Sequence, residues 1–206
     1  MADYKKPDYW QIKAQKEGYP ARSVYKLDEM NGKFHFLNKP RAGAAVKVLD
    51  LGAAPGSWSL YVLRKIGAQG FLAAADLSPL SRHYDQGLFD RENFFFMQGD
   101  ITSQAVQQEL LSRGPYSLLL SDAAPATTGN RSVDTARSLE LAEAVIAYAE
   151  VALAAGGALV LKVFQGGDTV SILKKIKELF ATGKSFKPEA CRSESFETYY
   201  IGLGKK

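Results

Sequence analysis

The chain has 206 residues with 46% hydrophobic and 23% charged residues, which is typical of one globular domain with a full core and excludes a disordered tail. No apolar run is long enough to cross a bilayer, and the N-terminus lacks the apolar region of a secretory signal. The formal net charge is +4, and the single cysteine, Cys191, excludes an internal disulfide, so we expect a cytoplasmic protein.

Basic residues are concentrated at the two ends of the chain. Residues 1–41 hold nine Lys and Arg against five Asp and Glu, residues 42–173 hold nine against thirteen, and residues 174–206 hold eight against four. Basic ends around an acidic centre indicate a polyanion that is held by the ends. On charge alone, ordinary surface lysines explain the pattern equally well.

The first 45 residues form a basic segment with a short helix expected around residues 21–30. From residue 46 onward, strands predicted over 46–51, 71–75, 94–97, 118–120 and 158–163 alternate with helices predicted over 57–66, 103–112, 134–154 and 168–180. This alternation predicts an α/β fold, a parallel sheet with helices on both faces. Residues 158–161 are apolar on both faces of a strand, as in a buried central strand, and Gly156 and Gly157 are expected to stop the preceding helix.

The C-terminal region departs from this alternation. Strands are predicted over 186–189 and 198–203, and residues 191–196 between them are too few for a helix. We therefore expect an antiparallel hairpin at the end of the sheet.

The segment 48–58, which reads VLDLGAAPGSW, predicts a strand, a glycine turn and the start of a helix. A dinucleotide site is disfavoured because Ala54 stands where a second glycine would admit a pyrophosphate, and a P-loop is disfavoured because no Gly-Lys-Ser/Thr follows. The turn suits a nucleoside without phosphates, such as S-adenosylmethionine. We expect the turn residues Gly52, Ala53, Pro55 and Gly56 to bind it.

Two acidic residues at strand ends support a nucleoside site. Asp76 follows the strand over 71–75, where its carboxylate could accept both ribose hydroxyls, and Asp100 follows the next strand, where it could meet the adenine amino group. Taken singly, each could be a helix cap or a turn former. The glycine turn and the two acids in this order favour S-adenosylmethionine.

Asp122 and Lys162 could act on a hydroxyl nucleophile, because each stands at or near the end of a buried strand on the same edge of the sheet as Asp100. An apolar environment would lower the pKa of Lys162 and nearby carboxylates would raise it, so a base and a fixed positive charge both remain open. The alternatives are a lysine that snorkels from a strand end and an aspartate of a turn. His35, His83 and Cys191 have no metal-ligand spacing, and we expect no metal.

Together these segments resemble the FtsJ/RrmJ-like RNA 2′-O-methyltransferases, from about residue 8 to residue 205. The matching segments are 18–27, 50–56, 121–125, 134–138 and 161–166. The resemblance implies one methyltransferase domain over residues 1–206, with residues 1–45 as a basic extension whose helix carries Lys26. It also implies the class I S-adenosylmethionine-dependent methyltransferase (Rossmann-like) sheet, with strand order 3-2-1-4-5-7-6, strand 7 antiparallel and helices on both faces.

The family uses a Lys-Asp-Lys-Glu tetrad, which the resemblance assigns to Lys26, Asp122, Lys162 and Glu197. Lys162 would activate the 2′-hydroxyl, Asp122 would orient Lys162, and Lys26 and Glu197 would position the ribose. Chemistry alone does not single out Lys26 or Glu197 from ordinary surface charges. The family's cofactor contacts carry over to Gly56, Trp58, Asp76, Asp100 and Asp122, with Trp58 acting through its backbone N–H while its indole could equally serve helix packing.

Three positions depart from the family pattern, namely Ser57, Ala126 and Cys191, and Ala126 lies nearest the expected substrate pocket. The implied function is S-adenosylmethionine-dependent 2′-O-methylation of RNA, with a uridine of 23S ribosomal RNA in the large subunit as target and a monomeric enzyme. A tRNA ribose methyltransferase is the alternative within the class. A non-catalytic RNA- or S-adenosylmethionine-binding module is disfavoured by the intact tetrad, and 45 residues before the first strand are too few for the additional domain of haemolysin-type relatives.

Overall fold

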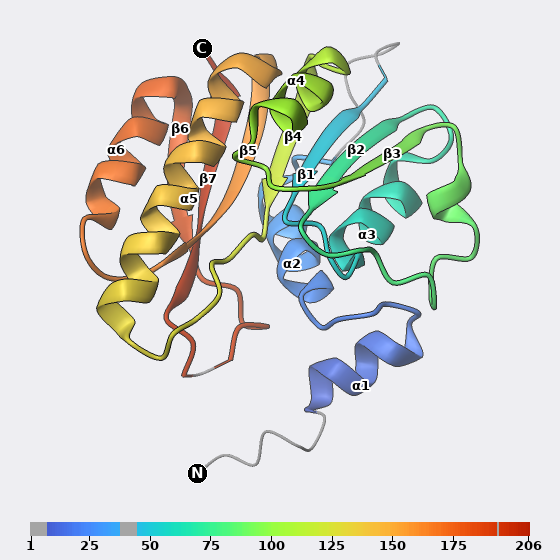
Figure 1. The fold of residues 1–206 in the computed structure, drawn as a ribbon, viewed down its shortest axis with the longest axis horizontal. Coiled ribbons are helices and arrows are strands. Elements are labelled where there is room, and N and C mark those ends of the chain that lie inside the picture. Colours follow the sequence, from blue (N-terminus) through green and yellow to red (C-terminus); the bar gives the residue numbers. More distant parts are fainter. Residues whose placement is uncertain (1–7, 38–44, 193) are drawn as a thin grey trace.

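The computed structural model describes residues 8–37, 45–192 and 194–206 (Figure 1). The described strands form one sheet in the order β3-β2-β1-β4-β5-β7-β6. Their bounds are β1 Lys47–Leu51, β2 Phe71–Asp76, β3 Phe94–Gln98, β4 Tyr116–Ser121, β5 Leu153–Phe164, β6 Phe180–Phe186 and β7 Glu197–Lys205. The helices are α1 Tyr9–Lys16, α2 Val24–Phe34, α3 Ser57–Ile66, the 3₁₀ helix Leu88–Asp90, α4 Gln104–Ser112, α5 Arg131–Ala152 and α6 Thr169–Leu179.

The strand pairing confirms the expected topology. Strands β1 to β5 pair in parallel, and β7 runs antiparallel between β5 and β6. Successive strand residues face opposite sides of a sheet. Val48 and Leu118 accordingly join a core with α2 and α3, whereas Leu49 and Leu119 join a second core with α4, α5 and α6. Both faces of the sheet are thus covered, as Figure 1 shows.

Two predicted boundaries at the C-terminal half are wrong. The sixth strand is Phe180–Phe186 and not 186–189, and it begins directly after α6. As an edge strand it buries only Phe180 fully and leaves its other residues partly or fully exposed, so no apolar alternation marks it. Helix α5 already ends at Ala152, and Gly156 lies inside β5, where its φ of 79° accompanies a register shift against β4.

The N-terminal segment holds one helix that was not predicted, α1, which is capped by Asp8, whose carboxylate accepts from the Gln11 N–H. The helix expected at 21–30 is α2, shifted to Val24–Phe34. Parts of the expected basic extension, residues 1–7 and 38–44, lie outside the described residues. No helix within the described ranges has the length and apolar character needed to span a membrane.

Candidate active site

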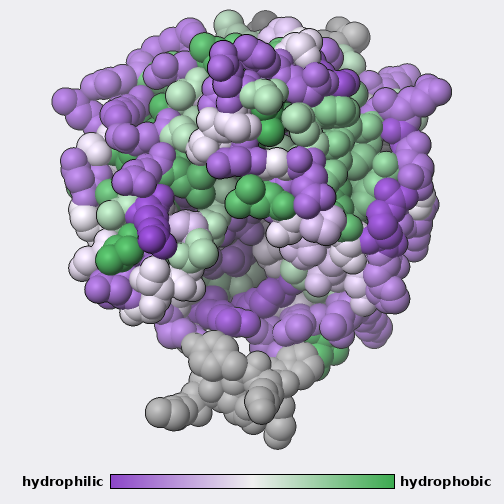
Figure 2. All heavy atoms as spheres, in the orientation of Figure 1, coloured by the Kyte–Doolittle hydropathy of each residue, from purple (hydrophilic) through white to green (hydrophobic). Residues whose placement is uncertain are grey.

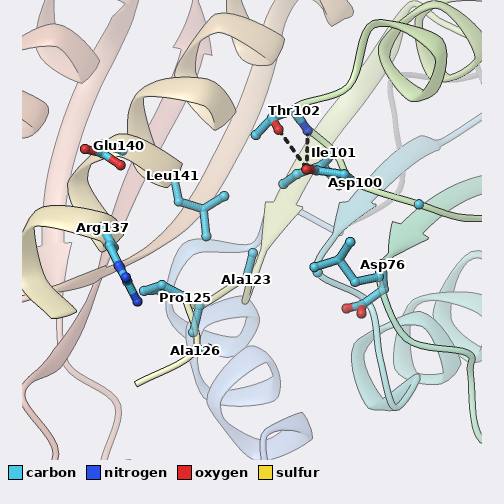
Figure 3. A pocket seen from close by; sticks show the side chains of 14 residues that line it. Asp76, Asp100, Ile101, Thr102, Ala123, Pro125, Ala126, Arg137, Glu140 and Leu141 are labelled. Carbon is cyan, nitrogen blue, oxygen red and sulfur yellow. Dashed lines mark hydrogen bonds between the residues drawn. The ribbon is translucent and has the colours of Figure 1, made fainter. Parts of the chain in front are cut away.

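A cavity of about 410 Å³ opens at the carboxyl ends of the strands, where the chain order reverses between β1 and β4 (Figure 3). Ligands bind at this point in open α/β sheets because the loops on either side diverge. Its lining comes from the loops after β1, β2, β3 and β4 and from α5. Of the residues predicted to bind a cofactor, Gly52, Asp76 and Asp100 line it.

Gly52 is required at the bottom of this cavity for two reasons. Its φ is 79°, in the left-handed region, and a Cβ there would stand 2.5 Å from the Cα of Ala123. The loops after β1 and β4 therefore approach each other as closely as the backbones permit. Ala123 also lines the cavity, so this close approach shapes its floor.

Asp76 and Asp100 present carboxylates to the cavity and are both fixed by local hydrogen bonds. Asp76 accepts from the N–H of Ala54 at 2.9 Å and from the N–H of Ser78 at 2.7 Å. Asp100 accepts from the N–H and the hydroxyl of Thr102, both at 2.8 Å, and these bonds lower its pKa below the ordinary value. Both groups are thus oriented acceptors, as the hydroxyls and amino group of a nucleoside require.

Apolar side chains complete the cavity, and they were not predicted as site residues. Leu77 is 71% exposed although it is large and apolar, and it lines the cavity beside Asp76 together with Ile101 and Leu141. Apolar walls with a few directed polar groups are the usual composition of a small-molecule site. The sequence did carry one signal for this apolar wall: Leu77 directly follows Asp76, and Ile101 directly follows Asp100.

Ala53, Pro55, Gly56 and Trp58 stand beside the cavity in the turn and at the start of α3, but they are not among its described lining residues. The Trp58 indole is 2% exposed and donates to the carbonyl of Ser23 at 2.8 Å. The indole therefore fastens α2 to α3, in accord with its packing role.

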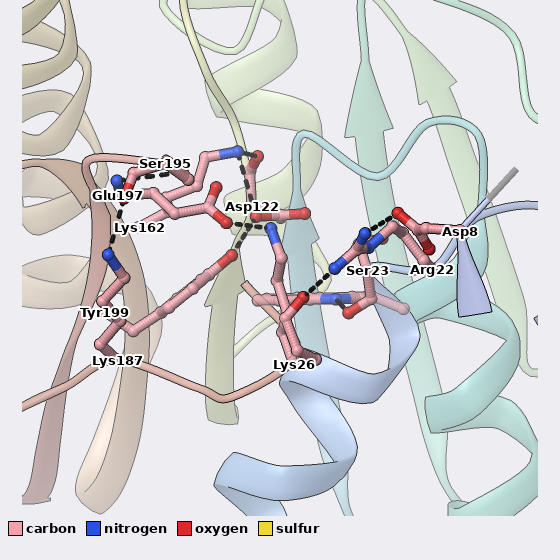
Figure 4. Close-up of polar contacts among 12 residues, drawn as sticks. Asp8, Arg22, Ser23, Lys26, Asp122, Lys162, Lys187, Ser195, Glu197 and Tyr199 are labelled. Carbon is pink, nitrogen blue, oxygen red and sulfur yellow. Dashed lines mark hydrogen bonds and ion pairs between the residues drawn. The ribbon is translucent and has the colours of Figure 1, made fainter. Parts of the chain in front are cut away.

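The predicted tetrad forms two ion pairs beside this cavity (Figure 4). Lys162 Nζ lies 3.1 Å from Asp122 Oδ1 and also donates to the main-chain carbonyl of Asp122. Lys26 Nζ, from α2, lies 2.5 Å from Glu197 Oε1 at the start of β7. Strand pairing accounts for the convergence, since β4 and β7 flank β5, which carries Lys162.

Tyr199 joins the two ion pairs and was not predicted. Its hydroxyl donates to Asp122 Oδ1 at 2.7 Å, and its ring centroid lies 5.9 Å from Lys26 Nζ. The side chain is fully buried. Tyr199 follows Glu197 by two positions on β7, so both project from the same face of the strand, and this period of two was the only signal within the sequence.

The charges in this cluster support one another. Burial alone would raise the pKa of Asp122, but Lys162, Lys26 and the Tyr199 hydroxyl hold it below its ordinary value. Burial would likewise lower the pKa of Lys26, yet Asp122 and Glu197 raise it above the ordinary value. The Asp122 carboxylate and the Lys26 ammonium are therefore both charged at neutral pH.

A second cavity, of about 500 Å³, lies on the other side of the tetrad and is lined by both Lys26 and Glu197. The loop after β4 separates the two cavities, with Ala126 lining the first and Thr127 the second. Asp134 holds this loop, because its carboxylate accepts from the N–H and the hydroxyl of Thr128 at 2.7 and 2.8 Å. Figure 2 shows a hollow in the lower centre of the molecule with hydrophilic side chains around it.

A family model described as FtsJ-like methyltransferase matches residues 19–205. The chain belongs to the FtsJ-like methyltransferase family. Relatives named ribosomal RNA large subunit methyltransferase E include one from Treponema denticola, 51% identical over 98% of this chain and 97% of its own, and one from Oleidesulfovibrio alaskensis, 43% identical over 97% and 92%.

Solved structures agree with the family assignment. A Plasmodium falciparum protein assigned as a ribosomal RNA methyltransferase has a TM-score of 0.74 and 25% identity, covering 91% of this chain and 98% of that one. Human methyltransferase-like protein 13, solved with S-adenosylhomocysteine, has a TM-score of 0.54 at 13% identity and shares the fold. The FtsJ-like chain is thus a methyltransferase with the class I fold.

Asp50, in β1, is a further polar residue near the site that its sequence context did not single out. It is fully buried, accepts from the Ser59 hydroxyl at 2.7 Å, and its Oδ1 has no hydrogen-bond partner among the described residues. Burial raises its pKa to about 7. Within the part of the chain that the structure describes, no cluster of His, Cys, Asp or Glu could hold a metal ion.

Proposed function

We propose that this FtsJ-like methyltransferase uses S-adenosylmethionine to methylate the 2′-hydroxyl of a ribose in ribosomal RNA. One observation carries the proposal: the Lys26–Glu197 and Lys162–Asp122 pairs stand next to two cavities, one lined by Ala123 directly after Asp122 and the other lined by Lys26 and Glu197. Methyl transfer needs a donor and an acceptor in line, and this arrangement offers a place for each.

The first cavity fits the methyl donor. Gly52 and Ala123 line the cavity where the loops after β1 and β4 approach each other, Asp76 and Asp100 offer acceptors, and Leu77 and Ile101 offer apolar faces for an adenine ring. Asp122 directly follows β4 and pairs with Lys162, and the next residue, Ala123, lines this cavity. When bound there, S-adenosylmethionine supplies an electrophilic methyl group on a sulfonium, and Gly52, Asp76 and Asp100 hold it in position.

Lys162 acts on the 2′-hydroxyl as a fixed positive charge. An ammonium group has three donors, and two of them are taken by the carbonyl and the carboxylate of Asp122. The third is left for the 2′-oxygen, where it would stabilise negative charge while the oxygen bonds to the methyl carbon, the carbon–sulfur bond breaks to release S-adenosylhomocysteine, and the hydroxyl proton passes to water. Asp122 stays ionised and orients Lys162, and the Lys26–Glu197 pair positions the ribose at the mouth of the second cavity.

The substrate proposal rests on the relatives. They are named ribosomal RNA large subunit methyltransferase E, and they match this chain over nearly its whole length. We propose the same substrate here, with a uridine of 23S ribosomal RNA as the methylated nucleotide and a monomer as the active form. The second cavity then receives a nucleotide that is turned out of the RNA.

The deciding experiment is transfer of a labelled methyl group from S-adenosylmethionine to large ribosomal subunits, small subunits and total tRNA from a strain that lacks the enzyme. We expect label in the large subunit alone, at one ribose that maps to a uridine and resists alkaline cleavage. Label in tRNA would instead support a tRNA ribose methyltransferase. Label on a base would refute ribose methylation.

A further inference from the structure

Two phenylalanine rings line the second cavity next to the tetrad. Phe196 immediately precedes Glu197, and Phe164 lies two positions after Lys162 on β5. Their ring centroids are 4.7 Å apart. Phe164 is buried and Phe196 is partly exposed, so an aromatic surface forms part of the wall of an otherwise polar cavity.

The Phe196 ring is held in place from several sides. Its main-chain carbonyl accepts from the N–H of Gln165 at 2.7 Å, and Phe164 is the register partner of Glu197 in the β5–β7 pair. The Arg131 guanidinium stands 5.3 Å from the ring centroid. The surface is thus pre-organised, and its contacts with a planar ligand need little ordering of the side chain.

We infer that Phe196, backed by Phe164, forms a stacking site for the base of the nucleotide whose ribose is methylated. This inference rests on the proposed function. If the ribose lies between Lys162 and the Lys26–Glu197 pair, its base must occupy the space next to them, and Phe164 and Phe196 are the aromatic side chains that line it. Aromatic rings are the usual partners of bases that are splayed out of an RNA strand.

The cavity also has the right size and edges for a nucleoside. Its volume of about 500 Å³ lies within the usual range for small-molecule sites, about 300–1,000 Å³. Hydroxyls of Ser23, Thr127 and Ser195 lie along it and can hydrogen-bond with a base edge or a ribose. Stacking on phenylalanine accepts any base, so Phe196 would secure the nucleotide while these polar groups select among bases.

The test measures binding and transfer with an RNA fragment that contains the mapped target nucleotide, made with and without the target base. The variant Phe196→Leu keeps apolar contact with Phe164 and removes the aromatic face, and Phe196→Trp restores an aromatic face. The matched control is Phe71→Leu. Phe71 is also partly exposed and lies at the opposite end of the strands, at the start of β2.

We expect Phe196→Leu to weaken binding of the intact RNA, with S-adenosylhomocysteine present, by about tenfold or more, as for the loss of one base–aromatic stack. Wild-type enzyme should lose a similar factor with the abasic RNA, and Phe196→Leu should then add less than about twofold. Phe196→Trp and Phe71→Leu should bind within about twofold of wild type.

Two results would separate this inference from the proposed function. The stacking site would be overturned if Phe196→Leu lost the same factor of binding affinity on intact and on abasic RNA, or lost none on intact RNA. Transfer to a ribose by the wild-type enzyme would in that case still support the proposed function. No transfer by the wild-type enzyme to any RNA, with S-adenosylhomocysteine bound normally, would overturn the function and the stacking site with it.

Discussion

Replacing Tyr199 with phenylalanine tests whether the buried hydroxyl organises the charges of the proposed catalytic tetrad. The change removes one hydrogen bond, 2.7 Å long, from the ionised carboxylate of Asp122 and keeps the ring that contacts Trp58 and Lys26. A hydrogen bond to a charged group contributes about 1.5–3 kcal/mol. We therefore expect Tyr199→Phe to lower the free energy of unfolding by ~2 kcal/mol, or Tm by roughly 4–8 °C for a chain of this length.

Tyr200 provides a matched control on the same strand. Its hydroxyl donates to a neutral acceptor, the carbonyl of Thr169, at 3.2 Å. Tyr200→Phe should cost about 0.5–1.5 kcal/mol because the acceptor carries no charge. Methyl transfer should fall about tenfold in Tyr199→Phe, equivalent to ~1.4 kcal/mol, because Asp122 then fixes Lys162 less firmly, and it should be unchanged in Tyr200→Phe.

The dependence on pH distinguishes electrostatics from packing. The pKa of Asp122 lies below its ordinary value, so its carboxylate stabilises the fold above the pKa of the unfolded chain and this stabilisation is lost as pH falls through the folded value. Removing the Tyr199 hydroxyl raises the folded pKa of Asp122, so less stability depends on the ionised carboxylate, and the acid loss of stability should be smaller and end at a higher pH. Chemical unfolding between pH 3 and pH 8 measures this, and a Tyr199→Phe curve parallel to that of Tyr200→Phe would refute the reasoning.

Four further outcomes follow from the site. Lys162→Ala should abolish methyl transfer and leave S-adenosylhomocysteine binding, measured by calorimetry, nearly intact, whereas normal turnover would exclude Lys162 from the mechanism. Asp50→Asn should become more stable relative to wild type as pH rises from about 4 to 7. The pKa of Asp50 is raised to about 7, so keeping the wild-type fold costs up to ~4 kcal/mol over this range, and a difference in the free energy of unfolding that stays constant with pH would contradict this. Gly52→Ala should destabilise the fold by ~2–4 kcal/mol and weaken cofactor binding, since its Cβ would meet the backbone of Ala123, and unchanged binding would show that the loops can part. RNA binding should weaken steeply between low and high salt while S-adenosylhomocysteine binding stays nearly constant, and a flat response would argue against contacts with phosphates.

The parallel strands were predictable because each is an apolar run between amphipathic helices, whereas their order in the sheet was implied by the family resemblance. The sixth strand was not predictable, since Phe180–Phe186 buries only its first residue fully and owes its place to pairing with β7 rather than to burial. The end of α5 was misplaced because Gly156 and Gly157 resemble a helix stop, whereas Gly156 serves a register shift in β5. Local signals identify buried elements and miss those that are fixed by a partner strand.

The same limit applies to the candidate site. Asp122 and Lys162 could be singled out because charged groups at the ends of buried strands are unusual. Lys26, Glu197 and Tyr199 look like ordinary surface or strand residues until the fold brings them together, and only the resemblance supplied the first two. Their burial and contacts depend on α2 packing beside β7, which no local pattern encodes.

The fold also brings together the two basic ends of the sequence. Arg22 donates to the carbonyl of Ala190, Glu29 accepts from the N–H of Glu189, and Lys26 pairs with Glu197, so the described part of the N-terminal segment is fastened to the C-terminal one. The two basic ends of the sequence therefore meet at the second cavity, whereas the more acidic centre of the chain lines the first cavity. A polyanion bound at that cavity would contact both ends at once, and this convergence favours the charge pattern as a binding surface over scattered surface lysines.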